Sequence, residues 1–283
     1  MIRELLVATN GFEGNWPAIQ YSAWLAEVLN IPVKLAGVVE PRHIPNIDDE
    51  THPLETIFSR AVVLFGSKGV DYQLEIHEGQ AEEIIPAQAG ERDCLTVLSP
   101  LGRSLLRRLY ERRSFHHFMA AIPSPILYVP KAYVPPERIL ICLGGLGYGL
   151  TVEHLGLEIA EKLKASITLL HVVPPIDKDY PESQHVLENW EHLEDTNTLV
   201  GSNLRAGLEM GQNAHLNIEV VTRQGNIIEE ILTELKEGGY GMVCMGSQYS
   251  ASGIRRYFTA NVTAEVAEAA ECPVLTARAE KEK

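Results

Sequence analysis

Short apolar runs alternate along the chain with longer amphipathic stretches. Largely apolar runs at 4–8 and 139–143 are typical of strands buried on both faces. Each run is followed by apolar residues spaced three and four apart, which predicts a helix with one face on a sheet. These residues are Ala18, Tyr21, Leu25, Val28 and Leu29 in the first case, and Val152, Leu155, Ile159 and Leu163 in the second.

The alternation continues to the end of the chain. We expect further strands at 33–39, 72–77, 94–99 and 125–129, and at 166–173, 217–222, 241–246 and 273–277. We expect further helices at 53–69, 80–89 and 113–121, and at 183–211, 226–237 and 261–270. Pro86 should kink or shorten the helix that contains it. The pattern predicts an α/β fold of two tandem Rossmann-like domains, each a five-stranded parallel sheet with helices on both faces.

The two halves are copies of one unit. Asn10 aligns with Gly144, a shift of 134, and Gly79 aligns with Gly225, a shift of 146. The shift grows mainly through an insertion after Val173. We therefore expect domains at 1–131 and 138–283, joined by the linker KAYVPPER with its two stiffening prolines.

The composition excludes several classes of function. A formal net charge of −14 opposes binding to nucleic acid and to anionic membrane surfaces. No apolar run approaches the ~18 residues that a membrane span needs, and the N-terminal residues do not have the pattern of a signal peptide. We expect a cytoplasmic protein. The 4 cysteines are widely spaced, which predicts reduced thiols without a disulfide.

Four segments of the second copy, LLHVV, GNIIEEI, VCMGS and ECPVL, resemble the universal stress protein family, as do LAGVV, GQAEEI, TVLSP and IPSPILYV in the first. The resemblance implies the tandem form of that family and a role in stress response. It also implies dimerisation through the final strands. A tandem chain can form this contact within itself, as an intrachain pseudo-dimer, and a homodimer of two chains is the alternative. Some members of the family bind ATP or related adenine nucleotides and others have lost the site.

The nucleotide site of this family has an Asp at the end of the first strand and a glycine motif after the fourth. The motif is Gly, two residues, Gly, nine residues, then Gly-Ser or Gly-Thr. Glycines let backbone N–H groups approach phosphate oxygens, and the last pair opens a helix whose N-terminus favours anions.

The first copy departs from this motif at most positions. Asn10 stands at the Asp position and Val38 at the strand position that meets adenine. Gly102 matches, but Ser99 replaces the first glycine and arginines replace the closing pair at 112 and 113.

The second copy retains more small residues. Gly144 stands at the Asp position, Val172 at the adenine position, and Gly246 matches the first glycine. The second glycine position falls at Tyr249, or at Ser250 if one residue is inserted. The rest of the candidate cradle is Ser247, Ser250, Ala260 and Asn261, with Asn261 as the expected N-cap of the last helix.

Other polar clusters favour simpler interpretations. GGLGYG at 144–149 is interpreted as a tight turn, because no third glycine falls at the spacing of a dinucleotide fingerprint. The arginines of 103–117 are interpreted as a solvated face, with an anion-binding patch as the alternative. The acidic residues of 177–195 are also interpreted as a solvated face, with a mobile lid as the alternative. His171 reads as a packed or pocket-wall residue. No catalytic motif and no metal-ligand spacing stands out.

The sequence therefore predicts a non-enzymatic stress-response protein with weak or lost adenine-nucleotide binding and no required cofactor, acting through dimerisation or protein partners. Two alternatives stay open. One is an ATP-binding switch that uses the pocket of the second domain, and the other is a slow adenine-nucleotide hydrolase.

Overall fold

The computed structural model describes residues 2–40, 52–90, 93–100, 115–131, 134–143, 150–173, 189–247 and 255–278. The chain forms two compact units, Met1–Pro135 and Pro136–Lys283. Within the described ranges, no helix is both long and apolar enough to cross a membrane.

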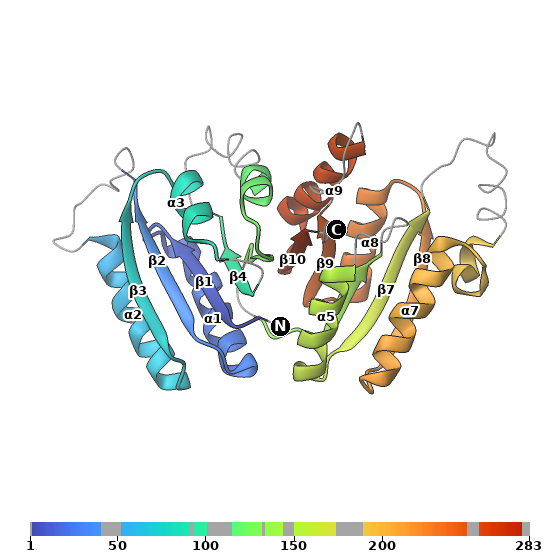
Figure 1. Cartoon of the computed structure of the whole chain (residues 1–283), viewed down its shortest axis with the longest axis horizontal. Coiled ribbons are helices and arrows are strands. Elements are labelled where there is room, and N and C mark those ends of the chain that lie inside the picture. Colours follow the sequence, from blue (N-terminus) through green and yellow to red (C-terminus); the bar gives the residue numbers. More distant parts are fainter. Residues whose placement is uncertain are drawn as a thin grey trace. The chain divides into compact units, whose positions relative to one another are not determined.

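The first unit is a parallel sheet with helices on both faces (Figure 1). Its strands are β1 (Glu4–Thr9), β2 (Val33–Val39), β3 (Tyr72–Glu78), β4 (Cys94–Leu98) and β5 (Ile126–Tyr128). They lie in the order β3-β2-β1-β4-β5, and every pair is parallel. Its helices are the 3-10 turn η1 (Glu13–Asn15), α1 (Trp16–Leu29), α2 (Pro53–Lys68), α3 (Ala81–Gln88) and a segment at 115–121.

The second unit repeats this topology. Its strands are β6 (Arg138–Cys142), β7 (Ser166–Val173), β8 (Ile218–Gln224), β9 (Met242–Ser247) and β10 (Val274–Arg278). They lie in the order β8-β7-β6-β9-β10, again all parallel. Its helices are α5 (Leu150–Leu163), α7 (Leu199–Asn213), α8 (Ile227–Gly238) and α9 (Arg255–Ala269), with a 3-10 segment η2 (Trp190–Asp195). The predicted fold class is confirmed.

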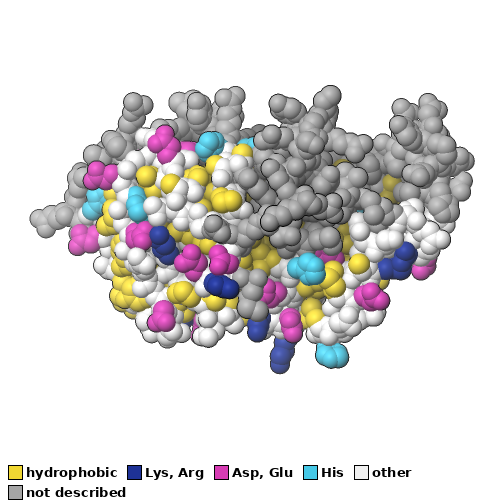
Figure 2. Space-filling view, in the orientation of Figure 1, with side chains coloured by type: hydrophobic (Ala, Val, Ile, Leu, Met, Phe, Trp, Pro, Cys, Tyr) yellow, Lys and Arg dark blue, Asp and Glu magenta, His cyan; other side chains and the backbone are white. Residues whose placement is uncertain are grey.

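Burial along the strands explains why the sequence predicted them. In the inner strands β1, β4 and β7 nearly every residue is buried, because helices cover both faces of the sheet. The outer strand β3 is instead partly exposed. Large exposed apolar side chains gather there and on α2, at Val63, Tyr72 and Ile76. Figure 2 shows apolar surface over this edge of the first unit.

Three helices begin or end at residues that the spacing of apolar positions alone does not predict, each for an identifiable reason. Pro86 leaves α3 with 8 residues, against 12 in its counterpart α8, as expected from the proline. The helix expected over 183–211 was predicted too long, because α7 begins at Leu199. Thr198 has an extended backbone and its side chain caps α7 by accepting a hydrogen bond from the Gly201 N–H (3.1 Å).

The last helix begins earlier than expected. α9 starts at Arg255, so Asn261 lies inside the helix and the expectation that it is an N-cap was wrong. The sequence RRYFTA contains neither glycine nor proline, so nothing in it stops the helix from extending toward Gly253.

Candidate functional site

In each unit the strand order reverses between the first and fourth strands, β1 and β4 or β6 and β9. β1 continues into β2 on one side, whereas β4 lies on the other side. In open α/β sheets, ligands bind in the crevice beyond the carboxyl ends of the strands at such a point. The residues that follow β1, β4, β6 and β9 are therefore the candidates for a site.

In the first unit, the side chain of Asn15 lies at this point and is fully buried. Its Oδ1 accepts hydrogen bonds from Thr9 Oγ1 (3.1 Å) and from the Asn10 N–H (3.2 Å). Its Nδ2 donates to Ser99 Oγ and to the Pro100 carbonyl oxygen, both at 2.9 Å. The amide thus uses both donors and both acceptor positions, and it ties the end of β1 to the end of β4.

Sequence reasoning missed Asn15, although its place in the chain gave a signal. It is a polar residue between a strand and a helix that begins Trp16-Pro17. Residues such as Asn often cap helices at this position, but Asn15 makes no side-chain cap to α1. Only the tertiary structure shows that its amide turns toward β4 instead.

The expected site residues of the first unit are partly brought together. Asn10 follows β1, and its Oδ1 accepts a hydrogen bond from the Phe12 N–H (3.3 Å). Thr9 pairs with Gly37, so Val38 is one residue beyond that pair on the neighbouring strand, where it is buried. Gly102 lies outside the described residues.

In the second unit, Val172 is buried near the end of β7, and Gly246 lies in β9. The Gly246 carbonyl accepts a hydrogen bond from Thr263 Oγ1 of α9 (3.3 Å), which holds that helix at the end of β9. Ser247 is the last residue of β9. Ala260 and Asn261 share α9, one turn or more beyond its start, and Ser250 lies outside the described residues.

His171 precedes Val172 in β7, the strand that pairs with β6. It is buried, and its Nδ1 is hydrogen-bonded to the Leu143 carbonyl oxygen (2.8 Å), directly after β6. Burial lowers the pKa of His171, and the bond to Leu143 partly offsets this effect. A neutral, oriented imidazole agrees with its interpretation as a packed residue at a strand end.

The four cysteines are free in the structure. Burial raises the pKa of all four thiols, to about 11 for Cys272. A thiol is nucleophilic only as a thiolate, so these side chains are poor nucleophiles at neutral pH.

Two other features lie away from the crevices. An apolar groove of about 470 Å³ runs between α2 and β3, lined among others by Phe58, Leu74 and Ile76. In the second unit, potential ligand atoms of His192, Glu194 and Asp195 lie within 4.8 Å of one another. His192 and Asp195 are exposed, and exposed acidic groups commonly lie together without a metal.

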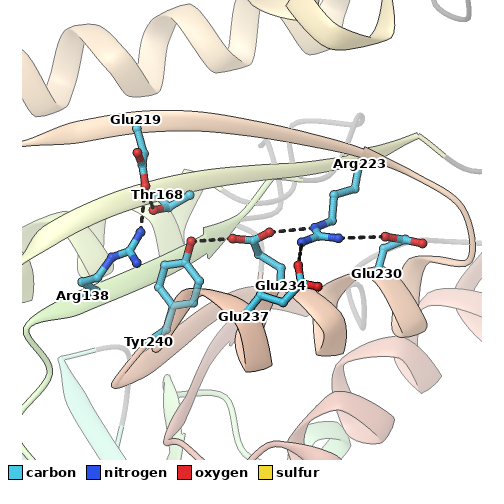
Figure 3. Close-up of polar contacts among 8 residues, drawn as sticks. All are labelled: Arg138, Thr168, Glu219, Arg223, Glu230, Glu234, Glu237 and Tyr240. Carbon is cyan, nitrogen blue, oxygen red and sulfur yellow. Dashed lines mark hydrogen bonds and ion pairs between the residues drawn. The ribbon is translucent and has the colours of Figure 1, made fainter.

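A polar network holds α8 against the sheet of the second unit (Figure 3). Arg223 of β8 contacts three glutamates of α8: Glu234 through Nε (2.7 Å), Glu230 through Nη1 (3.4 Å), and Glu237. The Tyr240 hydroxyl donates to Glu234 (2.7 Å). Burial is the main reason that the pKa of Tyr240 rises to about 12, so this donor keeps its proton.

Comparison with known proteins agrees with this architecture. The family model described as "Universal stress protein family" matches residues 136–278, half of the chain. No curated protein sequence matches significantly.

Among solved structures, a universal stress protein from Archaeoglobus fulgidus is similar over 99% of this chain and 97% of its own, with a TM-score of 0.70 and 14% identity. A putative universal stress protein from Pseudomonas aeruginosa covers 98% and 94%, with a TM-score of 0.62 and 16% identity. The cytoplasmic domain of a prokaryotic cation chloride cotransporter covers 99% and 96%, with a TM-score of 0.51 and 15% identity. These likenesses show a shared fold across both units, and the family match shows that the chain belongs to the universal stress protein family.

Proposed function

We propose that this chain is a non-enzymatic stress-response protein in which the second unit carries a weak adenine-nucleotide site and the first unit has lost its site. The observation that supports this most directly is the buried amide of Asn15 between the ends of β1 and β4.

The Asn15 amide closes the place where a nucleotide would enter the first unit. A ligand there would have to displace hydrogen bonds to Thr9, Ser99 and the Pro100 carbonyl. Each buried polar group left without a partner costs about 1–3 kcal/mol. The lost interactions would offset most of the free energy gained from binding a small ligand.

The second unit has no equivalent side chain. At the shift of 134 that aligns the first strands, Asn15 corresponds to Gly149 in the GGLGYG segment. A glycine has no side-chain amide that could take the role of Asn15, and this sequence difference supports the second unit as the one that retains a nucleotide site. The missing Asp at Gly144 weakens adenine and ribose recognition, because one charged hydrogen bond is worth roughly 1.5–3 kcal/mol.

Titration calorimetry with ATP tests this proposal. The wild-type chain should bind weakly, and Ala260→Trp, at a candidate cradle position of the second unit, should abolish the heat signal. Asn15→Gly should leave that signal unchanged or add a second binding event in the first unit. Asn213→Gly, at an exposed position at the end of α7, is the matched control.

The rival functions predict different results. Tight wild-type binding abolished by Ala260→Trp would favour the ATP-binding switch in the second unit. ADP release that disappears in the same variant would favour the hydrolase. ATP binding that survives Ala260→Trp and is lost in Asn15→Gly would place the site in the first unit and overturn the proposal.

A further inference from the structure

Glu153, in the first turn of α5, is a buried acid that the candidate site does not use. It is only 2% exposed, and its Oε1 has no hydrogen-bond partner. This oxygen lies against Gly207 of α7, since a Cβ on that glycine would be 2.6 Å from it. The carboxyl group therefore occupies the interface between α5 and α7.

The other copy shows that the fold does not need an acid here. At the shift of 134, Glu153 corresponds to Ile19 of α1, which is fully buried. At the later shift of 146, Gly207 corresponds to Ala61 of α2, also fully buried. The second unit thus combines an acid with the glycine that makes room for it, where the first has two apolar side chains.

The charged groups of α7 and β7 do not pair with Glu153. On α7, Arg205 and Glu209 are exposed, and Arg205 donates to the carbonyl oxygens of Glu194 and Thr196. On β7, the one titratable group is His171, whose Nδ1 is held by the Leu143 carbonyl.

The remaining charged groups of α5 are all more exposed than Glu153. His154 and Glu161 are exposed, Glu158 is half-buried, and Lys162 lies in the last turn. Burial alone raises the pKa of Glu153 to about 7. The carboxyl therefore changes its charge near neutral pH.

We propose that Glu153 is a proton-operated switch in the second unit. As a neutral acid it lets α5 pack on α7, and as a carboxylate it draws water and loosens the first turn of α5. That turn receives the chain from β6, at the crevice where the second site is proposed. The effect of pH on nucleotide affinity rests on the proposed function, whereas the effect on α5 does not.

The sign of the pH dependence follows from the raised pKa. The folded unit holds the Glu153 proton at pH values where the unfolded chain, with an ordinary pKa of 4.5, has lost it. The stability that this proton supports is complete below about pH 4.5. It falls as the pH rises to about 7 and then stays constant.

Hydrogen-exchange mass spectrometry of the full chain tests the switch without any ligand. After correction for intrinsic exchange, protection of α5 should fall about 50- to 100-fold between pH 5 and pH 8, if the opening exposes Glu153. In Glu153→Gln the fall should disappear, and Glu161→Gln should retain it. If the Gln variant does not fold, Glu153→Ile introduces the residue of the first copy and should also be insensitive to pH.

Equal pH dependence in the wild type and the Glu153 variants, or none in the wild type, would overturn the switch. ATP titrations at pH 6 and pH 8 form a separate arm. If the protection of α5 depends on pH but ATP binds at neither pH, the switch is supported and the proposed nucleotide site is rejected.

Discussion

At the scale of single residues, the loop after β1 depends on Gly11 as much as on Asn15. Gly11 has a positive φ of 86°, and a Cβ there would lie 2.9 Å from the backbone nitrogen of Leu54. Real Cβ atoms do not approach backbone so closely, so the start of α2 would have to move. The glycine thus fixes how the β1–α1 loop contacts α2, beside the Asn15 network.

We expect Gly11→Ala to lower the free energy of unfolding by about 3 kcal/mol or more. Gly69 is a matched control, because its φ is also positive (64°) but no atom lies within 4 Å of its would-be Cβ. Gly69→Ala should lower the free energy of unfolding by only about 1–2 kcal/mol, because alanine disfavours the left-handed conformation but meets no steric clash there. Urea unfolding measures both values, and equal losses in the two variants would contradict the steric argument.

At the scale of elements, Arg223 secures α8 on the edge of the second sheet. Its partner Glu234 has a side chain that is only 9% exposed and is also bound by Tyr240. Removing the guanidinium would leave the buried Glu234 carboxylate with the neutral Tyr240 hydroxyl as its one remaining donor in this network. Removing the exposed partner Glu237, whose side chain is 62% exposed, would leave the inner pair intact.

Arg223→Met should therefore destabilise the unit by about 2 kcal/mol, and Glu237→Gln should change it by less than about 0.5 kcal/mol. Hydrogen exchange should show the Arg223 effect first in α8. An Arg223→Met chain with unchanged protection of α8 would show that apolar packing alone holds the helix.

At the scale of the whole molecule, the family resemblance predicts that the final strands β5 and β10 pair within the chain. Pro123 and Glu271 precede these strands at equivalent positions of the two copies. Fluorophores attached there through unnatural amino acids should give one narrow energy-transfer population, because paired edges fix their separation. A broad distribution would indicate two independently moving units, whereas a concentration-dependent signal between singly labelled chains would favour a homodimer.

Much of this molecule was predictable from local pattern. The inner strands β1, β4 and β7 are buried on both faces, and such strands must be apolar throughout, so their positions and the repeat could be read directly. Boundaries were less predictable where a single contact decided them. The Thr198 N-cap makes α7 begin at Leu199. The start of α9 lies at Arg255, because no earlier residue of the helix stops it.

The sequence by itself determined the α/β class, the duplication and the family, because these depend on periodicity and on ordered motifs that a chain carries without being folded. Only the tertiary structure decided what fills the first candidate site and which acid is buried between α5 and α7. Asn15 reaches Ser99 across 84 positions of sequence, and Glu153 meets Gly207 on another helix. Such contacts follow from how strands and helices pack, since a side chain's partners, burial and charge state are properties of its folded surroundings.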